Sequence, residues 1–495
     1  MIHTYSLGRA VRFYPERLAL ASGARRSTFG ELHDRVGRIA TSLKEHGFAV
    51  GDRLALLLPN EADYLELIYA CAWLGVIAVP LNTRLSAREI DRVLADATPR
   101  GLIRHSSMAV PSVQLQWQIV LDEEALDARP GSHPEAIYDP QAVLALVYTS
   151  GTTGRPKGVV LTHANVLENL DHVNYWMTYK EGGVYLHAAP IFHIADFPFI
   201  FGSPGFGACQ VTIPKFSAQS FCETVERERV SHTVLVPTMI SLLIQFPDLR
   251  NYDLTSLEVI GYGGSAIAPE LIRRTRDALP GIKLIQVYGL SETGFLTGLQ
   301  DHEHTEARLK SCGRPCLGID VRVVDESGQE VETGHPGELV ARGANVMRGY
   351  WNNPEETERA FRNGLFRTGD VGHQDADGYF YILDRVKDMI VTGGENVYSG
   401  EVEAVIYELP AVREAAVFGI PDPQWGELVA ACVVLEPGDR LSAEDLVAHC
   451  HRSLANYKIP RRVEFSDVEL PKSGSGKILK RVLRERFWVQ QKRAV

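Results

Sequence analysis

The sequence predicts an α/β fold, because two hydrophobic periods alternate through its first three-quarters. Short apolar runs that end in glycine or proline are typical of buried parallel strands, and segments with helical spacing separate them. Such runs lie at 53–60, 231–237, 257–264 and 282–289. Ligands of parallel sheets bind beyond the carboxyl ends of the strands, so we expect functional groups directly after these runs.

The first long helix is expected to begin at a capping box, Thr28-Phe-Gly-Glu31, and to end before Gly47. Its buried face would carry Leu32, Val36, Ile39 and Leu43. The most apolar stretch, 64–81, contains Glu66 and a terminal proline. This pattern favours a buried helix and turn over a membrane span.

Beyond about Gly318 the pattern changes to short strands joined by turns. Another change follows Asp384–Asp388, where a compact unit begins with a helix from Ser399 and continues with two strands, 415–420 and 428–436. The sequence therefore predicts a large N-terminal part and a smaller α+β unit at the C-terminal end.

Composition and charge bear on the class of protein and on its compartment. The chain has 495 residues and a net charge of −11, which argues against nucleic-acid binding. Seven scattered cysteines fit a reducing compartment, and the N-terminus shows no signal peptide or transmembrane segment, so we expect a cytoplasmic protein. The sequence does not determine the oligomeric state, and a homodimer is compatible with it.

The most informative stretch is YTSGTTGRPKG, Tyr148–Gly158, which follows a strand-like run. Glycines let backbone N–H groups converge on an anion, hydroxyls add donors and a lysine adds charge, so this stretch predicts a phosphate-binding loop. It does not fit the Walker pattern of ATPases and kinases. An ordinary turn is the alternative for such a loop taken alone. The candidate phosphate ligands are Thr149, Ser150, Gly151, Thr152, Thr153, Gly154 and Lys157.

Four more motifs follow in order: QVYGLSE (286–292), FRTGD (366–370), DRVKDMIVTGGENV (384–397) and PKSGSGKILK (471–480). With the phosphate loop, they resemble the acyl- and aryl-activating adenylate-forming ligases, of the acyl-CoA synthetase type. The resemblance implies an N-terminal ATP- and acid-binding domain of several subdomains, 1–386, and a mobile C-terminal domain, 387–495, which carries the catalytic lysine. It also implies ATP, Mg²⁺ and coenzyme A as cofactor and co-substrates.

The resemblance assigns the metal to Glu292, since a carboxylate suits Mg²⁺, although a solvated loop acid is the alternative. Ser291 stands where the family usually has threonine and keeps the hydroxyl. Asp370 and Arg385 match the ribose-binding pair, and Tyr288 and Gly289 match the adenine side. Gly264 and Ser265 belong to GYGGSA, whose glycines would let the backbone approach the nucleotide and the acyl group.

Lys477, in SGSGK, matches the lysine that delivers positive charge to the carboxylate–phosphate junction during adenylation. His193 matches the histidine between the nucleotide and acyl pockets, although a buried structural histidine is the alternative. Asp196 is unusual at its position, where small residues are common. Neither Cys312 and Cys316 nor the His302–Glu306 segment has the pattern of a metal site.

The predicted activity is an acid–CoA ligase that acts through an acyl-adenylate. GYGGSA and DRVKDMIVTGGENVY favour a medium- or long-chain fatty acid. An aryl acid, or a stand-alone enzyme that loads a carrier-protein thiol, remains open. The motifs also permit the activation half of a luciferase-type reaction, but no feature of the sequence calls for oxygen chemistry.

Overall fold

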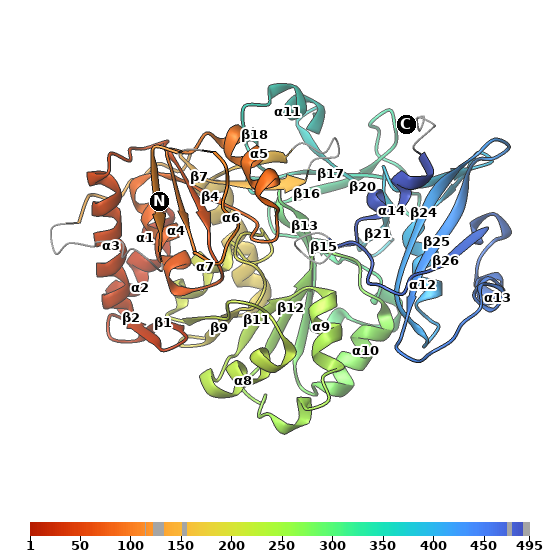
Figure 1. Ribbon diagram of the computed structural model, residues 1–495, viewed down its shortest axis with the longest axis horizontal. Helices are drawn as coiled ribbons and strands as arrows, with labels where there is room; N and C mark the ends of the chain where they lie inside the picture. Colours follow the sequence, from red (N-terminus) through yellow and green to blue (C-terminus); the bar gives the residue numbers. More distant parts are fainter. Residues whose placement is uncertain (114, 122–132, 151–155, 473–477, 489–495) are drawn as a thin grey trace.

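The computed structural model describes residues 1–113, 115–121, 133–150, 156–472 and 478–488. Within these residues, a large N-terminal part contains three sheets, and a smaller unit with its own sheet follows at the C-terminal side (Figure 1). This mixed α/β architecture confirms the predicted fold class. In the part of the chain that the structure describes, no helix is long and apolar enough to cross a membrane.

The first sheet carries Tyr288 and Gly289 of the candidate site on its strand β13. Its described strands run in the order β15-β14-β13-β12-β11-β9-β10-β1-β2, and the central pairs from β13 to β1 are parallel. The strands are β1 (Leu18–Ser22), β2 (Arg25–Thr28), β9 (Val184–His187), β10 (Cys209–Thr212), β11 (His232–Leu235), β12 (Val259–Gly263), β13 (Lys283–Leu290), β14 (Gly294–Leu299) and β15 (Arg314–Pro315).

The second sheet carries the phosphate-loop hairpin. Its described strands run in the order β18-β8-β7-β4-β3-β5-β6, with β7 and β8 antiparallel and β4, β3, β5 and β6 parallel. The strands are β3 (Arg53–Leu57), β4 (Ile77–Pro80), β5 (Gly101–Arg104), β6 (Trp117–Val120), β7 (Val143–Ser150), β8 (Pro156–Thr162) and β18 (Gly349–Tyr350).

Helices cover both sheets. In α6, Val166 and Leu170 pack with the second sheet's core, whereas Val173 and Met177 join the first sheet's core. The helices α8, α9 and α10 cover the other face of the first sheet (Figure 1). The helices of the N-terminal part are α1 (Ile2–Tyr5), α2 (Leu7–Phe13), α3 (Phe29–Glu45), α4 (Ala62–Leu74), α5 (Ala87–Ala97), α6 (His163–Met177), α7 (Phe199–Gly202), α8 (Ala218–Glu228), α9 (Pro237–Ile244), α10 (Pro269–Ala278) and α11 (Pro354–Ala360), with 3₁₀ turns η1 (Ser203–Phe206), η2 (Leu249–Asn251), η3 (Asp301–Glu303) and η4 (Glu306–Arg308).

The local signals of the first helices are confirmed. Thr28 and Glu31 form the predicted capping box of α3, and Gly47 follows its end with a φ of 82°. The apolar stretch forms the buried helix α4 and then strand β4. Glu66 is fully buried in α4 but is ion-paired with Arg25 and Arg35. These two guanidinium groups offset part of the cost of burying its charge, although burial still raises the pKa of Glu66.

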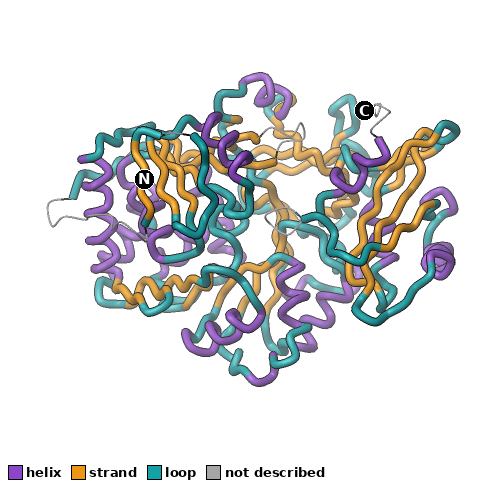
Figure 2. Tube along the Cα trace, in the orientation of Figure 1, coloured by secondary structure: helices purple, strands orange, loops and turns teal. Residues whose placement is uncertain are grey.

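A third sheet completes the N-terminal part, and a fourth, whose long strands lie on the right of Figure 2, forms the C-terminal unit. Among described residues, the third sheet contains β16 (Asp320–Val324), β17 (Gly337–Arg342), β19 (Phe361–Arg362), β20 (Leu365–Gln374) and β21 (Phe380–Arg385). The fourth contains β22 (Ile390–Thr392), β23 (Glu395–Val397), β24 (Val412–Asp422), β25 (Gly426–Leu435) and β26 (Arg462–Phe465), covered by α12 (Ser399–Ile406), α13 (Ala443–Ser453), η5 (Asn456–Lys458) and α14 (Lys480–Trp488). The third sheet ends at Arg385 and the fourth begins at Ile390, so only a short turn joins them.

Four buried histidines predict that acid destabilises the fold. Burial lowers the pKa of His3 and His163 to about 3, and that of His193 and His232 to about 4. These values lie below the unfolded value of about 6.5, so between about pH 6.5 and 4 the unfolded chain binds more protons and stability falls as pH falls. We expect a loss of about 1.4 kcal/mol per pH unit for each histidine that stays neutral.

Urea unfolding at pH 7, 6 and 5 measures this slope. His232→Asn should reduce it, whereas His335→Asn, at an exposed position, should leave it unchanged. Equal stability of the wild-type chain at pH 7 and pH 5 would contradict the prediction.

Candidate active site

Residues from three sequence motifs meet around Asp370. The Tyr288 hydroxyl donates a 2.7 Å hydrogen bond to Asp370 Oδ2, and Arg385 Nε lies 2.9 Å from Oδ1. Antiparallel pairing of β20 with β21 places Asp370 opposite Arg385. Burial and the Asp370 carboxylate raise the pKa of Tyr288, so its hydroxyl remains a donor. The cluster presents a buried, charge-balanced carboxylate, which is suited to accepting hydrogen bonds from hydroxyl groups.

A second cluster surrounds Glu292, in the turn after β13. The Tyr350 hydroxyl donates a 2.8 Å hydrogen bond to Glu292 Oε1, and Lys157 Nζ lies 5.1 Å from the centre of the Tyr350 ring. Lys157 is also ion-paired with Glu356 of α11. The backbone N–H of Met347 donates to the Glu292 carbonyl at 2.7 Å, which holds the turn in place. The predicted metal ligand and the predicted phosphate lysine therefore both contact one tyrosine, Tyr350.

The phosphate motif lies at the end of the β7–β8 hairpin. Thr149 pairs with Lys157 and Ser150 with Pro156 across the two strands. Gly158 is close to Tyr148, since a Cβ there would lie 2.9 Å from the tyrosine ring. The predicted ligands Gly151, Thr152, Thr153 and Gly154 lie outside the described residues.

The other predicted backbone positions follow strands β12 and β13. Gly264, just after β12, has a φ of 80°, which favours glycine. Ser265 follows it and is half-buried. Gly289 has no room for a side chain, because a Cβ would lie 1.7 Å from the Gly294 carbonyl oxygen. Ser291 and Glu292 form the turn directly beyond β13.

His193 lies in the segment between β9 and α7. Its Nδ1 accepts a 3.1 Å hydrogen bond from the Ala195 N–H, so the neutral ring carries its proton on Nε2. Burial lowers the pKa of His193 to about 4, although nearby Asp196 opposes this shift. Asn60 braces the segment: its Nδ2 donates to the Ala189 carbonyl at 2.7 Å, and its Oδ1 accepts from Ile191 N–H at 3.0 Å. His193 is thus a neutral donor near neutral pH.

Asp196 does not give the acid side of the site a charged lining. It is fully buried and accepts hydrogen bonds from Tyr185 and His187.

The predicted catalytic Lys477 lies outside the described residues. Helix α14 begins three residues later, and its first residue, Lys480, is ion-paired with Glu403 at 2.8 Å. Arg484, in the same helix, donates a 3.1 Å hydrogen bond to the Lys387 carbonyl. The helix after Lys477 is therefore connected to the turn between the third and fourth sheets.

Sequence reasoning missed Tyr350, Glu356 and Asn60. None belongs to the five motifs quoted above, and each reaches its partner from a distant part of the chain. The only available signal was GYWNNPEE (349–356), where a turn and a proline at N1 announce helix α11.

The residues around Glu292 fit a magnesium ion that is bound mainly by phosphate and water. Mg²⁺ usually takes one or two protein carboxylates and keeps several waters. Within the described residues no group of three or more histidine, cysteine, aspartate or glutamate side chains could hold a metal. Glu292 would thus serve as a single protein ligand rather than as part of a closed cage. When bound, the ion would neutralise charge on the nucleotide phosphates.

Glu292→Gln tests this assignment. A neutral amide is a weaker ligand for a hard cation, so we expect the apparent affinity for Mg²⁺ to fall at least about tenfold. The measurement is a magnesium titration of ATP–pyrophosphate exchange. Glu355→Gln is the matched control, because this carboxylate is 84% exposed on α11. Unchanged magnesium dependence in Glu292→Gln would make Glu292 an ordinary loop acid.

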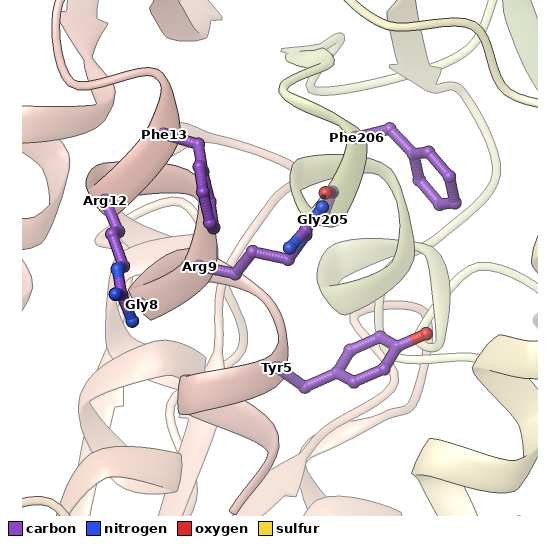
Figure 3. Close-up of a pocket in the computed structure, with 7 residues that line it drawn as sticks. All are labelled: Tyr5, Gly8, Arg9, Arg12, Phe13, Gly205 and Phe206. Carbon is purple, nitrogen blue, oxygen red and sulfur yellow. Dashed lines mark hydrogen bonds between the residues drawn. The ribbon is translucent and has the colours of Figure 1, made fainter.

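A groove of about 560 Å³ lies elsewhere, between α2 and η1 (Figure 3). It is lined by Arg9, Arg12 and Phe13 on one side and by Gly205 and Phe206 on the other, with Tyr5 below. Arg9 Nε donates a 3.1 Å hydrogen bond to the Gly205 carbonyl. None of the predicted site residues that the structure describes lines this groove.

Comparison with known proteins shows the family of the chain. Residues 7–351 match the model of the AMP-binding enzyme family, and residues 401–477 match that family's C-terminal domain. A feruloyl-CoA synthase from Amycolatopsis sp. is 39% identical over 97% of this chain and 98% of its own length. The long-chain-fatty-acid–CoA ligase FadD13 from Mycobacterium tuberculosis is 36% identical over 93% of both chains.

The fold is similar to that of o-succinylbenzoate CoA synthetase from Bacillus subtilis. That enzyme in complex with its acyl-adenylate intermediate OSB-AMP gives a TM-score of 0.87 at 33% identity, over 99% of both chains. Its complex with ATP and a magnesium ion gives a TM-score of 0.87 over 97% of this chain and 98% of that one. With family matches over both parts of the chain, the protein belongs to the AMP-binding enzyme family, within the adenylate-forming ligases of the acyl-CoA synthetase type.

Proposed function

We propose that this ligase converts a carboxylic acid, ATP and coenzyme A into an acyl-CoA, AMP and pyrophosphate. In the first half-reaction a carboxylate oxygen attacks the α-phosphorus, and the bond to the bridging oxygen breaks to release pyrophosphate. In the second, the coenzyme A sulfur attacks the acyl carbon, AMP leaves and the thiol proton is lost to a base or solvent. The observation that carries the proposal is the meeting of Tyr288, Asp370 and Arg385 beside the Glu292–Tyr350–Lys157 cluster.

The proposed roles follow from these contacts. Asp370 accepts hydrogen bonds from the ribose hydroxyls, and Arg385 holds its charge in place. Tyr288 packs against adenine. Lys157 neutralises phosphate charge, which requires it to leave or share its ion pair with Glu356. His193 donates from Nε2 on the acid side of the site.

We also propose that the chain works as two domains, 1–386 and 387–495. The short turn after β21 and the separate fourth sheet support this boundary. Lys477 would then reach the α-phosphate as part of the C-terminal domain. The cysteines support a reducing compartment, because all seven are buried free thiols.

Two acid classes are candidates. The sequence motifs favour a medium- or long-chain fatty acid, whereas the 39% identity with a feruloyl-CoA synthase favours an aryl acid. Coenzyme A is the proposed acceptor, with a carrier-protein thiol as the alternative.

The test is a panel of fatty and aryl acids with ATP and Mg²⁺, measured as AMP release with and without coenzyme A. We expect AMP release to require an acid, and turnover to require coenzyme A. Absence of adenylation with every acid would contradict the ligase assignment. Turnover with a phosphopantetheinylated carrier protein but not with coenzyme A would support the alternative acceptor.

A further inference from the structure

A buried hydrogen-bond network lies directly behind the His193 segment. Asp196 Oδ1 accepts a 2.8 Å hydrogen bond from the Tyr185 hydroxyl, and Oδ2 lies 2.6 Å from His187 Nδ1. His187 Nε2 is 3.0 Å from Gln210 Oε1. These four residues are completely buried. Tyr185 and His187 are alternate residues of β9, so both side chains point to the face on which Asp196 lies.

Tyr185 is also the first ring of an aromatic wall, which we define as Tyr185, Phe199 and Phe295. The Tyr185 and Phe199 rings are stacked at 4.9 Å between centroids, with an angle of 6° between planes. Phe199 meets Phe295 edge-on at 6.0 Å. Phe295 is paired in register with Gly289, next to Glu292. The wall therefore runs from the His193 segment, through one buried core, to the residue paired with Gly289 of β13.

The wall has little freedom to open. Turning Tyr185 away would break its hydrogen bond and leave the buried Asp196 carboxylate with an unmet acceptor, which is costly. Behind the wall, Val173, Trp176 and Met177 of α6 are buried in the same core. Gly261 shows how closely they pack, because a Cβ there would lie 3.2 Å from the Met177 sulfur. An extended acyl chain that entered here would have to displace packed side chains.

We propose that Asp196 is a positioning residue for acid specificity: it holds Tyr185 against Phe199, closes the acid pocket at the aromatic wall and thereby selects compact aryl acids over extended acyl chains. The proposal rests on the ligase function proposed above and narrows its substrate class. It also gives a role to the unusual aspartate. Neutral small residues at position 196 would leave Tyr185 and His187 without their common acceptor.

The experiment compares kcat/KM for 4-hydroxycinnamate and dodecanoate in the full-length enzyme, measured as adenylation by ATP–pyrophosphate exchange. We expect the wild type to favour 4-hydroxycinnamate about tenfold or more, the scale on which apolar pockets discriminate between side chains. Phe199→Ala removes the middle ring, and the ratio should shift toward dodecanoate about 10- to 100-fold. Tyr185→Phe keeps the ring but loses the bond to Asp196, so it should shift the ratio the same way by about threefold or more.

Phe201→Ala is the matched control. Phe201 lies on the same helix and is equally buried, but it packs against Tyr69 and Phe197 in another core. It should lose similar stability and leave the acid ratio within about twofold of wild type. If Phe199→Ala does not fold, Tyr185→Phe carries the test.

Two results would overturn the proposal that the aromatic wall sets acid specificity. One is a wild-type enzyme that favours dodecanoate. The other is a ratio of kcat/KM for the two acids that neither Phe199→Ala nor Tyr185→Phe changes while adenylates still form. Absence of adenylates with both these acids and every other acid of the panel would instead overturn the ligase function itself. The two failures are therefore distinguishable.

Discussion

Lys477→Ala will lower the rate of acyl-adenylate formation about 10²–10³-fold or more, the loss expected when one preorganised charge donor is removed. During adenylation, negative charge builds where the carboxylate meets the α-phosphate, and an ammonium placed there stabilises the transition state more than the ground state. ATP–pyrophosphate exchange measures this step. Conversion of supplied acyl-AMP and coenzyme A to the thioester should change far less, because adenylation is then complete.

Lys472→Ala is the matched control for this variant. Lys472 belongs to the same motif, where its backbone pairs with Ile478, but its ammonium is ion-paired with Glu414 and Glu469. It should keep both half-reactions near wild type. Adenylation at a near-wild-type rate in Lys477→Ala would remove the lysine from the mechanism.

Much of the fold follows from short-range signals. The capping box at Thr28 was visible because its partner residue, Glu31, is three positions away. Strands β11, β12 and β13 were visible as apolar runs ending in proline or glycine. Their parallel pairing then brings the groups at their carboxyl ends together, which is why a site could be predicted there.

The remaining features depend on contacts between distant segments. Tyr350 reaches Glu292 because β18 pairs with β8, and no local pattern encodes that pairing. Glu66 is a charged residue in an otherwise apolar helix, and its pairing with Arg25 and Arg35 depends on segments that are distant in the sequence. The direction of Asp196 could not be predicted either, because it depends on which face of β9 carries Tyr185 and His187. The class of acid that the enzyme accepts is hard to predict because it too depends on contacts between segments that are distant in the sequence.

The turn that joins the third and fourth sheets is the proposed hinge of the chain. The two half-reactions need different surroundings: Lys477 at the α-phosphate first, then an open path for the thiol. A rotation of the C-terminal domain about a few residues would provide both. Lys387 lies in this turn, burial lowers the pKa of its amino group, and its carbonyl accepts a 3.1 Å hydrogen bond from Arg484 of α14. A change in the conformation of this turn would therefore act directly on helix α14, which follows Lys477.

Lys387→Pro should spare adenylation and lower thioester formation about 10²-fold, the scale of a small misplacement of reacting groups. Proline fixes φ near −65° and restricts Val386 as well, so the turn could keep one conformation but not exchange between two. Pyrophosphate exchange and thioester formation from supplied acyl-AMP measure the two halves separately. Lys387→Ala is the matched control, because it removes the amino group but leaves the backbone free, and both rates should stay near wild type. Equal loss of both half-reactions in Lys387→Pro, or loss of neither, would contradict the hinge. Only a domain that must rotate between the two steps would lose thioester formation while it keeps adenylation.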